Sequence, residues 1–199
     1  MTDIFKRYGL LLALVALVQT GALVKIVYDR EALLKAGREI VLPVQPVDPR
    51  DLFRGDYVIL GYDISQVTLP SAIESANLGV LRRGDPVYVT LQPVANGGWI
   101  VTGLAETYPS HGTAGGVTLK GRVTYGPFTD PRSPSTGAQR VSVRYGIESY
   151  FVPEGTGRKL EADVREKKIQ AIVAVGSDGT AAIKGLMIDG ERHEAPPLL

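Results

Sequence analysis

The feature that most constrains this chain is an apolar stretch close to its N-terminus. Residues 8–28 have a tyrosine at each end and a single charged side chain, Lys25. A helix needs about 20 largely apolar residues to cross the hydrocarbon of a membrane. Aromatic rings favour the membrane interfaces, and a lysine near the end can extend to the headgroups. The stretch therefore predicts a transmembrane anchor helix, which continues to residue 36 and stops at Gly37.

A cleavable signal peptide is the alternative interpretation of the same residues. Lys6 and Arg7 precede an apolar core at residues 10–18, and the small residues 20–22 are typical of a cleavage site. We favour a signal anchor because residues 8–28 together reach the length of a full span. Lysines and arginines lie on both sides of the span, so their bias does not decide the topology. A short N-terminal tail before a long domain favours a domain outside the cytoplasm.

Small residues recur on one face of this predicted helix. Gly9, Ala13, Ala16 and Thr20 follow one another at spacings of four, three and four, which places them on the same side. Small side chains let helices approach closely in lipid. This face predicts packing against a multi-pass membrane protein or self-association, although glycine is also frequent in membrane helices without such a role.

The rest of the chain has the composition of a turn-rich β protein. Its 199 residues include 23 glycines and 13 prolines, and apolar and polar residues alternate between these turn formers. Expected strands cover residues 57–64, 87–93, 99–107, 117–125, 140–145 (or 140–152), 169–175 and 180–188. Residues 39–47, with their prolines, are expected to form an edge strand or an extended entry into the domain. Hairpin turns are expected at 96–98 and 177–179, and short helices at 71–78 and 157–168.

We therefore predict a mainly β (β-rich α+β) extracytoplasmic domain tethered by one N-terminal transmembrane helix. The anchor and its extension occupy residues 1–36, and the β-rich domain occupies residues 37–190. Residues 191–199 are expected to form an unpacked C-terminal tail.

The composition also excludes several kinds of site. Cysteine is absent, which removes disulfides, thiol catalysis and thiolate metal centres. Two histidines, His111 and His193, are too few for a histidine-rich metal site, and 22 basic against 21 acidic residues give no basic excess for nucleic acid. No nucleotide-binding or serine-nucleophile motif is present. We expect no cofactor, no metal, no nucleic-acid partner and no catalytic residue.

The most distinctive motif lies near the start of the predicted domain. Gly55, Asp56 and Tyr57 open it, and Leu60 and Tyr62 follow within one predicted strand. Glycine permits positive φ, and aspartate accepts bonds from nearby backbone N–H groups. We therefore interpret the Gly-Asp pair as a turn that leads into a strand.

Two further observations support a structural role for this motif. Alternation places Val58, Leu60 and Tyr62 on one face of the predicted strand. Residues 83–86, Arg-Gly-Asp-Pro, repeat the same turn before the strand at 87–93. We interpret the motif mainly as a builder of the fold, with a ligand or partner surface as the alternative.

A second stretch, residues 145–155, contains Glu148, Tyr150 and Glu154. Together with the first motif it resembles the bacterial GDYXXLXY family, whose name spells the motif and whose five named positions all match. The resemblance implies a membrane-anchored bacterial protein. With the topology favoured above, we expect the anchor in the inner membrane and the domain in the periplasm. Such proteins are often encoded beside multi-pass membrane proteins. The resemblance implies no established activity.

Two functions are open at this point. The first is a membrane-anchored accessory subunit or binding module of an envelope membrane-protein complex, in the lipid bilayer and without catalysis. The alternative is a carbohydrate-acting or other carboxylate-based hydrolase that uses Asp56 with Glu148 or Glu154, because glycosidases need two suitably spaced carboxylates. The charged residues at 48–56 would then form a polar site with the second stretch, and the carboxyl groups would converge within about 10 Å.

Overall fold

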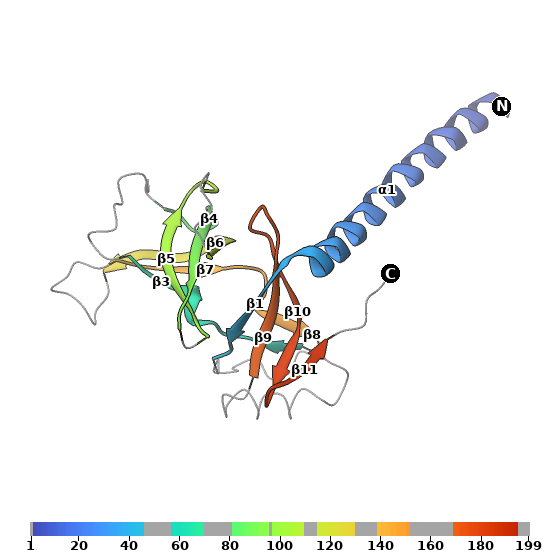
Figure 1. Ribbon diagram of the computed structural model, residues 1–199. Coiled ribbons are helices and arrows are strands. Elements are labelled where there is room, and N and C mark those ends of the chain that lie inside the picture. Colours follow the sequence, from blue (N-terminus) through green and yellow to red (C-terminus); the bar gives the residue numbers. More distant parts are fainter. Residues whose placement is uncertain are drawn as a thin grey trace.

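The computed structural model describes residues 2–45, 57–69, 81–95, 97–109, 115–129, 139–151 and 169–194. In these ranges the chain forms one long N-terminal helix followed by antiparallel strands in three sheets (Figure 1). The prediction of a mainly β domain with one N-terminal helix is confirmed. The short helices predicted at 71–78 and 157–168 lie outside the described residues.

Helix α1 (Thr2–Ala36) extends away from the sheets (Figure 1). Its segment Leu11–Ala36 is long and apolar enough to cross a membrane, and its most apolar window is not covered by the rest of the protein. The helix ends where predicted, because the Gly37 N–H donates to the Leu33 carbonyl oxygen at 2.8 Å. A Cβ at Gly37 would lie 2.5 Å from that oxygen and 3.1 Å from the Cβ of Ala174. Glycine is therefore required at this close approach.

The last turns of α1 pack against the first sheet. Glu31 is 5% exposed, the only buried charged side chain in the described part of the chain, and its carboxylate lies 3.5 Å from the ammonium group of Lys35. Leu33 reaches the turn between β9 and β10, where its Cδ1 would lie 3.2 Å from a Cβ at Gly176. The helix is thus attached to the sheet by packed side chains and by its covalent connection.

Four strands form the first sheet, in the order β1-β9-β10-β11: β1 (Arg38–Pro43), β9 (Ile169–Val175), β10 (Ala181–Ile188) and β11 (Glu191–Glu194). The proline-containing strand β1 is an edge strand, as predicted. The predicted β9–β10 hairpin is confirmed, because the Gly176 N–H donates to the Thr180 carbonyl oxygen at 2.8 Å.

Five strands form the largest sheet, in the order β3-β7-β6-β4-β5: β3 (Gln66–Leu69), β4 (Pro86–Pro93), β5 (Trp99–Ala105), β6 (Val117–Thr129) and β7 (Gln139–Arg144). Its edge strands β3 and β5 contact each other, so the sheet curls toward closure. The smallest sheet pairs β2 (Tyr57–Ile59) with β8 (Ser149–Phe151), and a short 3₁₀ helix, η1 (Asp63–Ser65), leads from β2 into β3.

One hydrophobic core connects the three sheets. Its fully buried side chains come from all three, for example Leu42 of β1, Leu60 after β2 and Leu119 of β6. The β-branched and leucine side chains alternate with polar ones along β4 and β6, which is the pattern of strands with one face in a core. About 150 residues of β-rich chain can bury such a core without disulfides.

Arg38 connects the end of α1 to the five-stranded sheet. Its guanidinium donates to the carbonyl oxygens of Gly115 and Gly116, at 2.6 Å each. The same group lies 5.9 Å from the ring centre of Trp99, within the range of a cation–π interaction. Both large sheets are therefore tied to the point where the helix ends.

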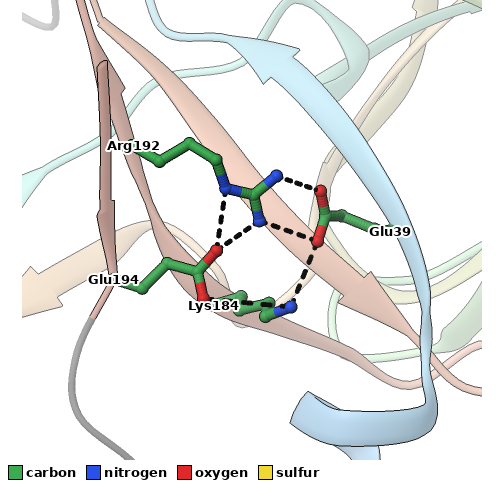
Figure 2. Close-up of polar contacts among 4 residues, drawn as sticks. All are labelled: Glu39, Lys184, Arg192 and Glu194. Carbon is green, nitrogen blue, oxygen red and sulfur yellow. Dashed lines mark hydrogen bonds and ion pairs between the residues drawn. The ribbon is translucent and has the colours of Figure 1, made fainter.

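The prediction of an unpacked tail is wrong for residues 191–194. These residues form β11, which pairs with β10, and Arg192 bonds to Glu39 on β1 at 2.7 and 3.0 Å (Figure 2). Arg192 also pairs with Glu194, and Lys184 bonds to Glu39 at 3.2 Å. Four charges on three strands thus fasten the C-terminal strand to the first one. Sequence reasoning missed them because a charged segment near a terminus is usually solvated.

This network predicts a specific dependence on pH. The hydrogen bond from Arg192, assisted by Lys184, lowers the pKa of Glu39 from its usual 4.5 to about 2. A lowered pKa in the folded state adds stability above the unfolded pKa, and this contribution is lost as pH falls toward 2. Glu39→Gln should therefore lower the urea midpoint at pH 7, and its difference from the wild type should shrink below pH 4.5.

The single tryptophan, Trp99, reports unfolding by its fluorescence. Glu191→Gln, at an exposed position on the same C-terminal strand, is the matched control and should leave the midpoint unchanged. A Glu39→Gln midpoint equal to that of the wild type at pH 7 would show that the network does not stabilise the fold.

Candidate functional site

The two motif stretches lie side by side in the structure. Strand β2 of the first stretch pairs antiparallel with β8 of the second, with Val58 opposite Tyr150. The Leu60 N–H extends the ladder and donates to the Glu148 carbonyl oxygen at 2.8 Å. Segments almost 90 residues apart thus form one unit.

Two buried tyrosines fasten this unit from opposite sides. The Tyr62 hydroxyl of the first stretch donates to the Ile147 carbonyl oxygen of the second at 2.8 Å. The Tyr145 hydroxyl of the second stretch donates to the Ile64 carbonyl oxygen of the first at 2.6 Å. Burial, aided by the negative charge of Glu148, raises the pKa of both phenols. Both therefore stay protonated and act as hydrogen-bond donors at neutral pH.

The structure confirms which side chains of the first stretch share a buried face. Val58, Leu60 and Tyr62 are 4%, 0% and 4% exposed, whereas Ile59 between them is 41% exposed. On the other side, the Gln45 N–H donates to the Gly61 carbonyl oxygen at 2.8 Å. The stretch thus joins the end of β1 to β8, and it leads through η1 into β3.

The Glu148 side chain stabilises a turn of the backbone. Its two carboxylate oxygens accept hydrogen bonds from the backbone N–H groups of Tyr145, at 2.6 Å, and Gly146, at 2.9 Å. Gly146 has φ of +82°, which favours glycine. The carboxylate therefore closes the turn that precedes β8. Both carboxylate oxygens are thus engaged within the turn itself.

Several predicted site residues lie outside the described residues. Gly55, Asp56 and Glu154 are among them, as are the other charged residues at 48–56. Tyr57 is described for its backbone, which begins β2, and Tyr150 is half-buried on β8. The convergence of Asp56 with either glutamate stays a prediction.

The repeat of the Gly-Asp turn at residues 83–86 is described, and it matches the turn interpretation. Gly84 has φ of +97°, and the Asp85 carboxylate accepts a hydrogen bond from the Arg82 N–H at 2.7 Å. Strand β4 begins at the next residue. Here the glycine allows the turn and the aspartate caps it.

Beside the two motif stretches the surface is hollowed. The hollow has a volume of about 660 Å³ and is lined by Gln45, Ile59, Leu60, Gly61, Tyr62, Asp63, Ser65, Gln66, Arg144, Glu148 and Ser149. Among the residues that the structure describes, no group of three or more histidine, aspartate or glutamate side chains is placed to hold a metal ion. The hollow can offer hydrogen bonds, one arginine and the carboxylates of Asp63 and Glu148.

Sequence reasoning missed Arg144 and Gln66. Both are outward-facing residues on paired strands, since Gln66 lies opposite Ser142 on β7. Alternation along residues 140–145 marks Arg144 as outward-facing, but its position beside the motif follows from strand pairing alone.

The family model described as GDYXXLXY protein matches residues 19–186, which include both motif stretches. The chain belongs to the GDYXXLXY family. No curated protein and no solved structure matches it. In this GDYXXLXY protein, the last two named positions of the motif, Leu60 and Tyr62, are core residues that join the sheets.

The predicted packing face of α1 is uncovered. Gly9, Ala13, Ala16 and Thr20 are all exposed, and a Cβ at Gly9 would meet no atom within 4 Å. None of the described strands covers this face.

Removing the hydroxyl group of either buried tyrosine is predicted to lower the stability of the domain. Tyr62→Phe leaves the buried Ile147 carbonyl without its donor and should lower the free energy of unfolding by about 1–3 kcal/mol. Tyr145→Phe should do the same through Ile64. Tyr150→Phe, at a half-buried position on β8, is the matched control and should lower the free energy of unfolding by less than about 0.5 kcal/mol.

Urea unfolding followed by Trp99 fluorescence measures all three variants, and a double-mutant cycle of the first two measures their coupling. Unfolding free energies of Tyr62→Phe and Tyr145→Phe within about 0.5 kcal/mol of the wild type would contradict the structural role of the pair.

Proposed function

We propose that this GDYXXLXY protein is a membrane-anchored accessory subunit or binding module of a bacterial envelope membrane-protein complex, without catalytic activity. The observation that supports it best is helix α1. The most apolar window of its segment Leu11–Ala36 extends uncovered from the domain, while its last turns are packed against β9 and β10.

An uncovered apolar surface of this length requires lipid or protein around it. Leucine and valine side chains point outward on every side of the helix, with Leu12 70% and Leu17 73% exposed. A helix that served only the domain core would bury one face. We therefore propose a single-pass anchor in the inner membrane, with the β domain in the periplasm.

The small-residue face of α1 supports a partner within the membrane. Between lipid and helix there is little hydrophobic gain, so close packing of small residues drives association. The partner is either a multi-pass membrane protein or a second copy of the chain. The β domain is then held at a fixed place beside that partner, because Glu31 and Leu33 join the helix to the sheet.

The position of Glu148 weighs against the carboxylate-based hydrolase. Both of its oxygens are occupied by backbone N–H groups of its own turn. An inverting or retaining glycosidase needs one carboxylate free to exchange a proton with substrate or water. The chemistry of this surface is hydrogen bonding, which suits a binding module.

Co-purification tests the partner. The tagged full-length protein is extracted from its native membrane in mild detergent, and the eluate is identified by mass spectrometry. We expect a stoichiometric multi-pass protein, or a dimer of the chain. Ala13→Leu with Ala16→Leu should remove it, whereas Val15→Leu with Val18→Leu, on other faces of the helix, should retain it. A wild-type protein that elutes alone as a monomer would contradict the accessory role.

The absence of cysteine makes the topology directly testable. The Glu191→Cys variant, changed at an exposed position on β11, should react with a membrane-impermeant maleimide applied to the periplasmic side of intact cells. The Thr2→Cys variant should react only after lysis. The opposite labelling pattern would place the domain in the cytoplasm.

A further inference from the structure

We propose that the hollow beside the two motif stretches binds a carboxylate carried on a short peptide chain, and that Arg144 holds that carboxylate. This goes beyond the proposed membrane function, because the hollow belongs to the β domain whichever partner α1 takes.

Arg144 is placed to receive an anion. It ends β7 between the buried residues Val143 and Tyr145, so its side chain points out of the core and lines the hollow. Within the part of the chain that the structure describes, its guanidinium forms no ion pair and no hydrogen bond. An arginine fork is suited to a carboxylate, which it can bind through two parallel hydrogen bonds.

The neighbouring strand strengthens the case for an anion. Arg122 of β6 lies directly opposite Arg144 in the strand register, and both are exposed. Like charges at directly opposed positions destabilise a sheet. Arg122 donates to the neutral carbonyl oxygen of Gly84 at 3.1 Å and forms no ion pair with any residue that the structure describes. An anion bound by Arg144 would reduce the repulsion between the two guanidinium groups.

Two acidic side chains limit the charge of an anion that the hollow can take. Asp63 and Glu148 also line it. Glu148 is held by backbone N–H groups, and Asp63 accepts a hydrogen bond from the Gln45 side chain at 3.0 Å. These two carboxylates would repel a dianion such as phosphate more strongly than a singly charged carboxylate.

The remaining lining suits a peptide. The Gln66 amide oxygen accepts from the Ser142 hydroxyl at 3.1 Å, which leaves its NH₂ group as a donor for a carbonyl oxygen. Ser149 adds a hydroxyl, and Ile59 adds an apolar side chain 41% exposed. A volume of about 660 Å³ exceeds the needs of one carboxylate and lies in the range of small-ligand sites. It accommodates a short peptide with one apolar side chain.

The test uses the full-length protein in detergent micelles and two probes that differ in one group. N-acetyl-Gly-Leu carries a free carboxylate, and N-acetyl-Gly-Leu-amide does not. Isothermal titration should show saturable binding of the acid, with binding of the amide weaker by about tenfold or more. Inorganic phosphate should not compete with the acid.

Variants assign the binding to Arg144. Arg144→Gln should weaken binding of the acid by about tenfold, and Arg144→Lys should weaken it less, because a lysine retains the charge without the fork. Arg83→Gln, at an exposed arginine that does not line the hollow, should bind as the wild type does. Unchanged Trp99 fluorescence and urea midpoints show that the variants are folded.

Three results would overturn the proposal: no saturable binding of the acid, equal binding of acid and amide, or equal binding by Arg144→Gln and the wild type. Where the acid binds as expected, the native complex identifies its source. Loss of the membrane partner from Arg144→Gln indicates a chain terminus of that partner, and retention indicates a free peptide.

Discussion

The reciprocal hydrogen bonds of Tyr62 and Tyr145 are the constraint on which the rest of the domain depends. Each buried phenol donates to a backbone carbonyl of the other motif stretch, so neither stretch can leave without stranding a buried acceptor. The backbone of residues 60 and 61 bonds to β8 on one side and to the end of β1 on the other. The first sheet, the small sheet and the five-stranded sheet meet at this point.

This arrangement explains the motif in physical terms. Leucine at position 60 is fully buried in the core, and tyrosine at position 62 fills it while its hydroxyl satisfies a carbonyl. Phenylalanine would match the volume but lose the bond. The described copy of the Gly-Asp turn, at Gly84 and Asp85, shows how such a pair leads the chain into a strand. The motif joins the sheets, and the ligand binding that we propose involves the residues beside it.

The sequence was informative where structure is set by neighbours along the chain. Alternation predicted that Val58, Leu60 and Tyr62 share a buried face, turn residues predicted the hairpin at residues 177–179, and Gly37 predicted the end of α1. Contacts between distant segments could not be predicted in the same way. The strand at residues 191–194 depends on Glu39, some 150 residues away, and the place of Arg144 beside the motif depends on which strands pair. Local sequence patterns do not specify these contacts, because the order of the strands is decided by the packing of the whole core.

Native-state hydrogen exchange of the Leu60 amide tests the central claim most directly. This N–H donates to Glu148 within the joined motif stretches, and the amide of Val173 in the core of β9 provides the reference for global unfolding. If the motif joins the sheets, both amides exchange with the same opening free energy, and Tyr62→Phe lowers both equally. Exchange of Leu60 at a free energy several kcal/mol below that of Val173 would contradict the account. It would show that the motif opens independently of the core, as a mobile binding surface does.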